Sequence, residues 1–224
     1  MIAKMLFQNV LFLGLVGLLL FVPAGRVDWI QAWAFMVLFF VVSLAVGFAL
    51  LRHDPELLRE RMSLPVTREM KPFDRAYVVL LVLGFFVWFA LMGLEARYNP
   101  PAWGVAGQAL GGVLVVACLW IAWLTFRENS FATPAVQIQK ERGQHVISTG
   151  PYALVRHPLY AGANLWMIGM PLMLGSRWGL IGSALMIALV AIRAIGEEKV
   201  LAEGLPGYDD YRRKVRFRVL PGVW

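Results

Sequence analysis

Cysteine and histidine are both scarce in this chain of 224 residues. It has one cysteine, Cys118, and three histidines. A single cysteine excludes a disulfide within the chain and a cysteine-based zinc site. The three histidines are far apart in the sequence, without a second ligand at the spacing of zinc sites. We therefore expect no metal site, and we expect Cys118, which lies in an apolar run, to serve packing.

The sequence also lacks the short motifs of several enzyme classes. It has no GxGxxG following a strand, no phosphate loop ending in Gly-Lys-Ser/Thr, and no serine or cysteine nucleophile motif. These absences argue against a nucleotide-binding domain of the soluble type and against the common hydrolases.

Charge is missing from several long stretches. The chain is 59% hydrophobic, whereas about half is usual for a soluble domain. We predict an all-α integral membrane protein with about five to six transmembrane helices. A signal peptide is the alternative for the first run, but its length favours a retained span. The last two runs are short and predict a helical hairpin that need not cross the whole bilayer. The runs are 5–22, 29–51, 77–94, 105–126, 159–174 and 178–195.

The basic residues are distributed unevenly between the two sides of these predicted helices. The formal net charge is +7, and eighteen of the 21 Lys and Arg residues fall at the termini or in the loops at 52–75 and 127–158. Basic residues mark the cytoplasmic side of membrane proteins, so both termini and both loops are predicted to be cytoplasmic. Contact with anionic lipid explains the positive charge, and we expect no nucleic acid partner.

Two short amphipathic helices are predicted outside the membrane. In the first loop, Asp54 before Pro55 is typical of a helix start, and the residues that follow place apolar side chains on one face, as in a helix lying on a membrane surface. In the tail, Tyr208 and Tyr211 are three residues apart and share a helix face.

Two polar clusters flank the predicted hairpin. The first is Gly150–Gly162, which contains Arg156, His157 and Tyr160; the second is the pair Glu197 and Glu198. A hairpin that leaves one membrane face and returns to it brings its two ends together, so we expect His157 and Tyr160 to lie close to the two glutamates. The simpler alternative is that each cluster marks only the place where a helix meets solvent.

Three ordered motifs resemble those of the isoprenylcysteine carboxyl methyltransferase family, within a wider group that includes membrane phospholipid methyltransferases. They are Gly-Pro-Tyr-x-x-Val-Arg-His-Pro-Leu-Tyr-x-Gly at 150–162, Glu-Glu-x-x-Leu at 197–201, and Gly-Tyr-x-x-Tyr at 207–211, followed by Arg-Phe-Arg-Val-Leu-Pro at 216–221. The resemblance is specific over 125–224 and only architectural over 1–124. The apolar runs and the basic residues predict a four-helix membrane region at 1–126, with a cytoplasmic loop at 52–76, and the resemblance implies a methyltransferase core with the cofactor site at 127–224.

The resemblance also implies the cofactor S-adenosylmethionine, bound at the cytoplasmic face and covered by the tail. Arg156 and Arg193 lie beside the two clusters, and we expect one of them to steady an anionic acceptor. The positions that match the family's cofactor contacts are His157, Pro158, Tyr160, Glu197, Glu198, Leu201 and Tyr211.

The acceptor of the methyl group is expected to enter from the bilayer, which indicates a lipophilic or amphiphilic molecule. The preferred acceptor is an isoprenoid or prenylcysteine-type carboxylate, and a lipid amine is the second candidate. We expect the membrane to be a bacterial inner membrane. We infer no obligate protein partner. Two alternatives stay open: an NADPH-dependent enzyme similar to sterol reductases, and a small transporter or structural protein. The reductases are expected to have Gly-Asp-Leu after the tyrosine, where this chain has Ala161-Gly162-Ala163.

Overall fold

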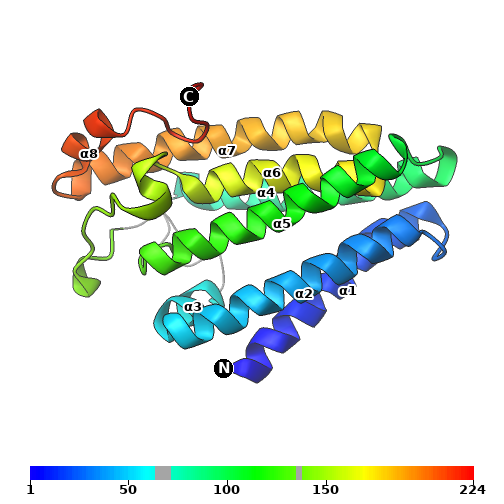
Figure 1. Cartoon of the computed structure of the whole chain (residues 1–224), viewed down its shortest axis with the longest axis horizontal. Helices are drawn as coiled ribbons and strands as arrows, with labels where there is room; N and C mark the ends of the chain where they lie inside the picture. Colours follow the sequence, from blue (N-terminus) through cyan, green and yellow to red (C-terminus); the bar gives the residue numbers. More distant parts are fainter. Residues whose placement is uncertain (64–71, 135–137) are drawn as a thin grey trace.

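The structure is a computed structural model, and it describes residues 1–63, 72–134 and 138–224. Within these ranges the chain is all-helical, as predicted (Figure 1). The α-helices are α1 (Ile2–Ala24), α2 (Ile30–His53), α3 (Pro55–Arg61), α4 (Pro72–Tyr98), α5 (Gly104–Glu128), α6 (Pro158–Leu174), α7 (Arg177–Gly204) and α8 (Tyr208–Lys214). Two 3-10 turns, η1 (Lys140–Arg142) and η2 (Gly150–Ala153), lie in the second long loop.

The long helices form a bundle whose two ends differ (Figure 1). At one end, which we call the loop end, lie α3, α8 and the described parts of the second long loop, residues 129–134 and 138–157. At the other, which we call the turn end, short turns join α1 to α2, α4 to α5 and α6 to α7. Five of the described helices, namely α1, α2, α4, α5 and α7, are long and apolar enough to cross a membrane. With 17 residues, α6 is about 25 Å long, somewhat short of a full crossing.

Glycines let α5 and α6 approach closely. A methyl group on Gly111 would meet the Met173 nitrogen at 2.4 Å, and one on Gly169 would meet the Gly111 carbonyl oxygen at 2.8 Å. Gly107 lies one turn before Gly111 on α5 but takes no part in this contact, because it faces the Trp103 side chain at the start of its own helix. This close packing fixes the start of α6 against the middle of α5. There, a methyl group added to Gly162 would lie 3.2 Å from the Cys118 carbonyl oxygen.

The predicted surface helix is present as α3. The Asp54 carboxylate accepts a hydrogen bond of 2.9 Å from the Leu57 amide, and Pro55 occupies the first turn. Burial opposes ionisation of Asp54, but this bond and others outweigh it and lower its pKa. Leu57 and Leu58 pack in an apolar cluster with Phe126 of α5. Part of the predicted loop, residues 64–71, lies outside the described residues.

The last long helix differs from the prediction. We expected an apolar helix ending at Ile195, with Glu197 and Glu198 at its exit, but α7 continues to Gly204 and includes both glutamates. The extension is stable because partners from other segments neutralise the buried Glu198, as described below. His53, directly before the surface helix, is the last residue of α2, and its Nε2 lies 3.1 Å from the Arg127 carbonyl oxygen.

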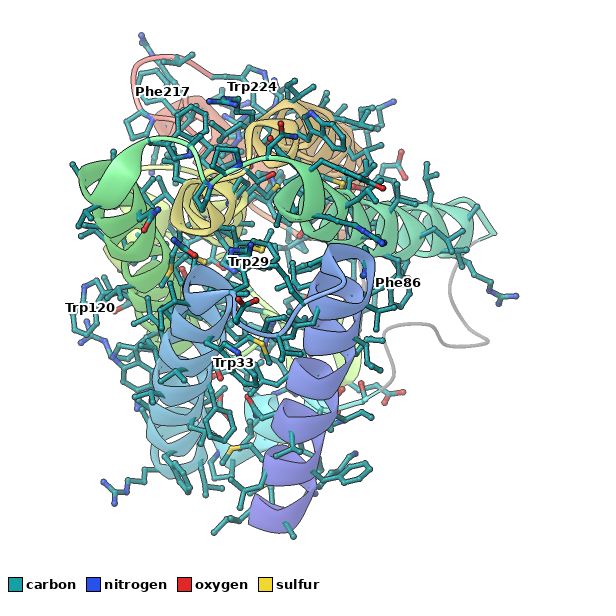
Figure 2. All side chains as sticks on the ribbon, turned by 90° about the vertical axis from the view of Figure 1, so that its right-hand side faces the viewer. Trp29, Trp33, Phe86, Trp120, Phe217 and Trp224 are labelled. Carbon is teal, nitrogen blue, oxygen red and sulfur yellow. The ribbon has the colours of Figure 1, made fainter. Side chains whose placement is uncertain are left out.

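The turn end contains a buried carboxylate of its own. Glu95 of α4 is 4% exposed and accepts hydrogen bonds from the Ser176 hydroxyl (2.5 Å) and from the amides of Arg177 (3.1 Å) and Trp178 (2.9 Å). Anions are favoured at a helix N-terminus, so Glu95 caps α7. Figure 2 views the bundle from this end, with Trp29 between the helices and Trp120 pointing away from α5.

Candidate functional site

Glu198 is the centre of a buried ion cluster at the loop end. Its side chain is on α7 and the residue is 5% exposed. The Oε1 atom accepts a hydrogen bond of 2.6 Å from Arg156 Nε and lies 3.3 Å from His157 Nε2. The Oε2 atom accepts from Arg218 Nε at 2.9 Å. A carboxylate can be buried when charged hydrogen-bond partners surround it, and here they come from two segments outside α7.

The C-terminal tail is joined to the segment before α6 by main-chain atoms as well. The amides of Arg156 and His157 donate to the carbonyl oxygens of Phe217 (3.0 Å) and Arg218 (2.8 Å). Arg156 Nη1 also donates to the carbonyl oxygens of Val215 and Arg216, at 2.8 and 2.9 Å. The side-chain donors of Arg156 are thus largely used inside the protein.

Glu197, the neighbour of Glu198, has a different environment. Its Oε2 accepts a hydrogen bond of 2.6 Å from the Tyr160 hydroxyl, and the ring of Tyr160 stacks on that of His157 with centroids 5.3 Å apart. The expected meeting of His157 and Tyr160 with the glutamate pair is therefore confirmed. Within the described ranges, the Oε1 atom of Glu197 has no hydrogen-bond partner, so it is free to bind a ligand.

A cavity of about 420 Å³ opens beside this cluster, within the size range of about 300–1,000 Å³ that is typical of small-molecule sites. Six of the seven predicted cofactor residues line it, and so do the predicted Arg156 and Arg193. Glu198 is the exception, because it lies behind the wall and orients Arg156 and His157. The six residues are His157, Pro158, Tyr160, Glu197, Leu201 and Tyr211.

Tyrosines form much of the cavity wall near α8. The Tyr211 hydroxyl donates to the Tyr152 carbonyl oxygen at 2.8 Å, and Tyr208 and Tyr211 pack together, as their spacing predicted. Burial raises the pKa of Tyr152, Tyr208 and Tyr211 above the ordinary tyrosine value. All three are neutral phenols near pH 7 and offer aromatic faces rather than charge.

Two residues that line the cavity each have a buried polar atom without a partner in the described part of the chain. The atoms are Nε of Arg193 and the hydroxyl oxygen of Tyr208. Arg193 is held by a bond of 2.6 Å from Nη2 to the Pro134 carbonyl oxygen, and it lies 5.7 Å from the Tyr77 ring centroid. Buried polar groups are seldom left unpaired, so these atoms indicate where a bound molecule would make hydrogen bonds.

This set of residues fits S-adenosylmethionine, which carries a carboxylate, an ammonium group, a ribose diol, a base and a sulfonium. A free carboxylate oxygen on Glu197 can accept from ribose hydroxyls or from the ammonium. Tyrosine faces can stack on the base or attract the sulfonium. Among the described residues, no cluster of three or more His, Cys, Asp or Glu could hold a metal ion.

Sequence reasoning missed several residues of the cavity wall. Asn129 lines it and donates to the Tyr152 hydroxyl at 2.7 Å. His145 also lines it, edge-on to Phe131 at 5.5 Å. Arg61 reaches the cavity from α3. The charge of Arg61 on a helix with an apolar face was the one available signal, but nothing in the sequence connects that helix to the site.

Comparison with known proteins gives two matches. Residues 106–206 match the family of phospholipid methyltransferases, in a segment that begins in α5 and ends just after α7. A relative described as nickel-cobalt-cadmium resistance protein NccN, from Alcaligenes xylosoxydans xylosoxydans, is 32% identical over 81 residues. That alignment covers 36% of this chain and 38% of the relative's length. The segment 106–206, which contains most of the cavity wall and two of the three motifs, therefore matches the phospholipid methyltransferase family, as the resemblance in the sequence predicted.

Proposed function

We propose that the protein is an integral membrane methyltransferase that transfers the methyl group of S-adenosylmethionine to a membrane-embedded or amphiphilic acceptor. One observation carries the proposal: a cavity of about 420 Å³ is lined by residues of all three motifs, and the segment 106–206 matches a methyltransferase family. The preferred acceptor is an isoprenoid or prenylcysteine-type carboxylate, and a lipid amine is the second choice.

In this proposal the two glutamates have separate tasks. Glu197 uses its free oxygen to hold the ribose or the ammonium of the cofactor, while Tyr160 fixes the other oxygen. Glu198 does not contact the cofactor; it holds Arg156, His157 and Arg218 in place. The cofactor supplies an electrophilic methyl group, and the protein contributes mainly alignment of the two reactants.

Arg193 is the residue that we assign to an anionic acceptor. Its Nε is buried and has no partner among the described residues, and Arg193 lines the same cavity as Glu197, one helical turn away on α7. Arg156 is less suited to this task, because its Nε and Nη1 already bind Glu198 and the tail. We therefore treat Arg156 as a positioning residue.

We further propose that the loop end is cytoplasmic and that the membrane is a bacterial inner membrane. The excess of Lys and Arg at this end supports the orientation. S-adenosylmethionine would then enter the cavity from the cytoplasm, and the acceptor would enter from the bilayer.

Calorimetry in neutral detergent tests the cofactor. Wild-type protein should bind S-adenosylhomocysteine, and Glu197→Gln should bind it roughly tenfold or more weakly, because a charged hydrogen bond contributes about 1.5–3 kcal/mol. Glu203→Gln is the matched control, since Glu203 is exposed on the same helix. An absence of heat with the wild type would refute the proposal, and saturable heat with NADPH instead would favour a reductase.

The acceptor can be identified with the methyl-tritiated cofactor. Membrane extracts fractionated by headgroup are incubated with wild-type or Arg193→Ala protein, and the labelled product is separated. We expect label in an anionic or amine-containing lipid fraction and its loss with Arg193→Ala. Unchanged turnover of Arg193→Ala would remove the role assigned to Arg193.

A further inference from the structure

In the part of the chain that the structure describes, the cavity has a second cation without an acidic partner, and it comes from the N-terminal part of the chain. Arg61 is the last residue of α3 and lines the cavity, although α3 lies outside the segment 106–206 that matches the methyltransferase family. Neither the family match nor the motifs assign it a role.

Two contacts of its side chain and the packing of its helix fix the position of Arg61. Its guanidinium carbon lies 4.2 Å from the Phe126 ring centroid, and Nη1 donates to the Ala132 carbonyl oxygen at 2.7 Å. The helix that carries it is held by Leu57 and Leu58, which pack with Phe126 and Ala132. The guanidinium is thus aimed at the cavity by a packed helix.

No acidic side chain of the described residues pairs with Arg61. Burial lowers the pKa of its guanidinium to about 10, and the one group that acts in the opposite direction is the phenol of Tyr152. Arg61 is still a cation near pH 7. A partly buried cation without a counter-charge is unfavourable, whereas Arg156, on the same cavity wall, is paired with Glu198.

The wall beside Arg61 is apolar and extends into the bundle. Cys118, Ala122 and Phe126 of α5 are four residues apart and all line the cavity, so they form a stripe about 12 Å long on one helix face. Leu159 and Ala163 of α6 line the cavity as well. A cation at the end of an apolar stripe matches a molecule with an anionic headgroup and a hydrocarbon chain.

We propose that Arg61 binds the phosphate or carboxylate of an amphiphile whose chain lies along Cys118, Ala122 and Phe126. That this amphiphile is the methyl acceptor rests on the proposed function; the binding itself does not. Guanidinium groups bind both anions through paired hydrogen bonds. The N-terminal part of the chain thereby selects the ligand, while the segment 106–206 holds the cofactor.

Native mass spectrometry of the full chain, released from neutral maltoside detergent, can measure this binding. The probes are dodecyl phosphate, dodecanoate, dodecanol and inorganic phosphate. Arg61→Gln should bind dodecyl phosphate and dodecanoate roughly tenfold or more weakly than wild type, with dodecanol binding unchanged. Arg61→Lys should lie between them. Arg59→Gln, on the exposed side of the same helix, is the matched control and should equal wild type.

A second variant tests the apolar stripe and does not depend on the folding of Arg61→Gln. Ala122→Leu adds volume to the stripe and leaves the charge intact, so it should weaken dodecyl phosphate and dodecanol alike. The proposal fails if either Arg61→Gln or Ala122→Leu leaves dodecyl phosphate binding unchanged. It also fails if inorganic phosphate binds as tightly as dodecyl phosphate, because the chain would then contribute nothing.

Calorimetry with S-adenosylhomocysteine separates this inference from the proposed function. Arg61→Gln should keep the wild-type affinity for it. If Arg61→Gln instead loses S-adenosylhomocysteine and keeps dodecyl phosphate, Arg61 holds the cofactor carboxylate and the inference is wrong. If wild-type protein binds dodecyl phosphate through Arg61 but shows no heat with S-adenosylhomocysteine, the inference stands and the methyltransferase proposal fails.

Discussion

The two ends of the bundle each contain a buried glutamate, and the two glutamates are satisfied in different ways. Glu95 at the turn end bonds to one hydroxyl and two amides, all at the start of α7. Glu198 at the loop end bonds to two arginines and lies within 3.3 Å of a histidine, and these partners come from the segment before α6 and from the tail. One carboxylate caps a helix, and the other joins three parts of the chain.

The two glutamates also differ in the size of the cavities beside them. The cavity beside Glu95 measures about 10 Å³, which is enough for about one water molecule. The cavity beside the Glu198 cluster measures about 420 Å³. Residues with a buried polar atom that has no partner among the described residues line both cavities: Trp29 lines the smaller one, and Arg193 and Tyr208 line the larger one. In this protein, burial of an acid or an unpartnered atom beside it therefore does not by itself mark a ligand site; the space available for a ligand does.

The largest expected effect in this comparison comes from Glu198→Ala. It leaves Arg156 buried without its counter-charge, and breaking a buried pair in this way destabilises a protein by about 3–5 kcal/mol. Thermal unfolding in detergent should show a strong decrease in stability, and calorimetry should show loss of S-adenosylhomocysteine binding. A variant that unfolds like wild type would mean that the cluster does not hold the tail.

Glu95→Ala should destabilise the protein less and leave the ligand site intact. It leaves one buried hydroxyl and two partly buried amides without their acceptor, and an unsatisfied buried group costs about 1–3 kcal/mol. The same two measurements should show a moderate loss of stability with unchanged affinity for S-adenosylhomocysteine. If the affinity for S-adenosylhomocysteine fell along with stability, the two ends would be coupled through α7, and Glu95 would not be independent of the ligand site.

Ser176→Ala removes the hydroxyl that binds Glu95 at the turn end. The Ser176 hydroxyl donates to Glu95 and accepts from the Gly179 amide at 2.8 Å, so the variant loses an N-cap, at about 1–2 kcal/mol. Ser148→Ala, at an exposed position in the second loop, is the control and should stay within about 0.5 kcal/mol of wild type. Equal effects of the two variants would contradict the capping role.

Arg218→Ala should have the smallest effect on stability. The Arg218 side chain is 32% exposed, so solvent screens its pairing with Glu198, and we expect about 1 kcal/mol or less. Screening also predicts that the difference from wild type shrinks when salt is raised from about 0.05 to 0.5 M. Arg213→Ala, which removes a more exposed pair with Asp210, should change the unfolding temperature even less. A larger effect at high salt would show that Arg218 acts through packing.

Local signals in the sequence predicted much of this structure. The apolar runs located the long helices, Asp54 and Pro55 located α3, and the spacing of Tyr208 and Tyr211 predicted their shared face. The meeting of His157 and Tyr160 with the glutamate pair followed from the hairpin, because its two ends must return to the same side.

The features that sequence reasoning missed depend on partners that are distant in the chain. Glu198 appeared to mark the end of a helix, because the arginines that neutralise it are Arg156 and Arg218, from other segments. Glu95 looked like an ordinary residue near a helix end, since two of its partners are backbone amides, which every residue has. Arg61 reaches the cavity only through the packing of α3 against α5.

The hydrogen bonds between the tail and the segment before α6 have a consequence for biosynthesis. The amides of Arg156 and His157 need the carbonyl oxygens of residues 217 and 218, which the ribosome adds about sixty residues later. The helices α1 to α5 are complete about ninety residues before these positions, so at about 5–20 residues per second they can enter the bilayer several seconds before those residues exist. During that interval the chain is inserted without its C-terminal contacts, and the Glu198 cluster is among the last parts of the molecule to form.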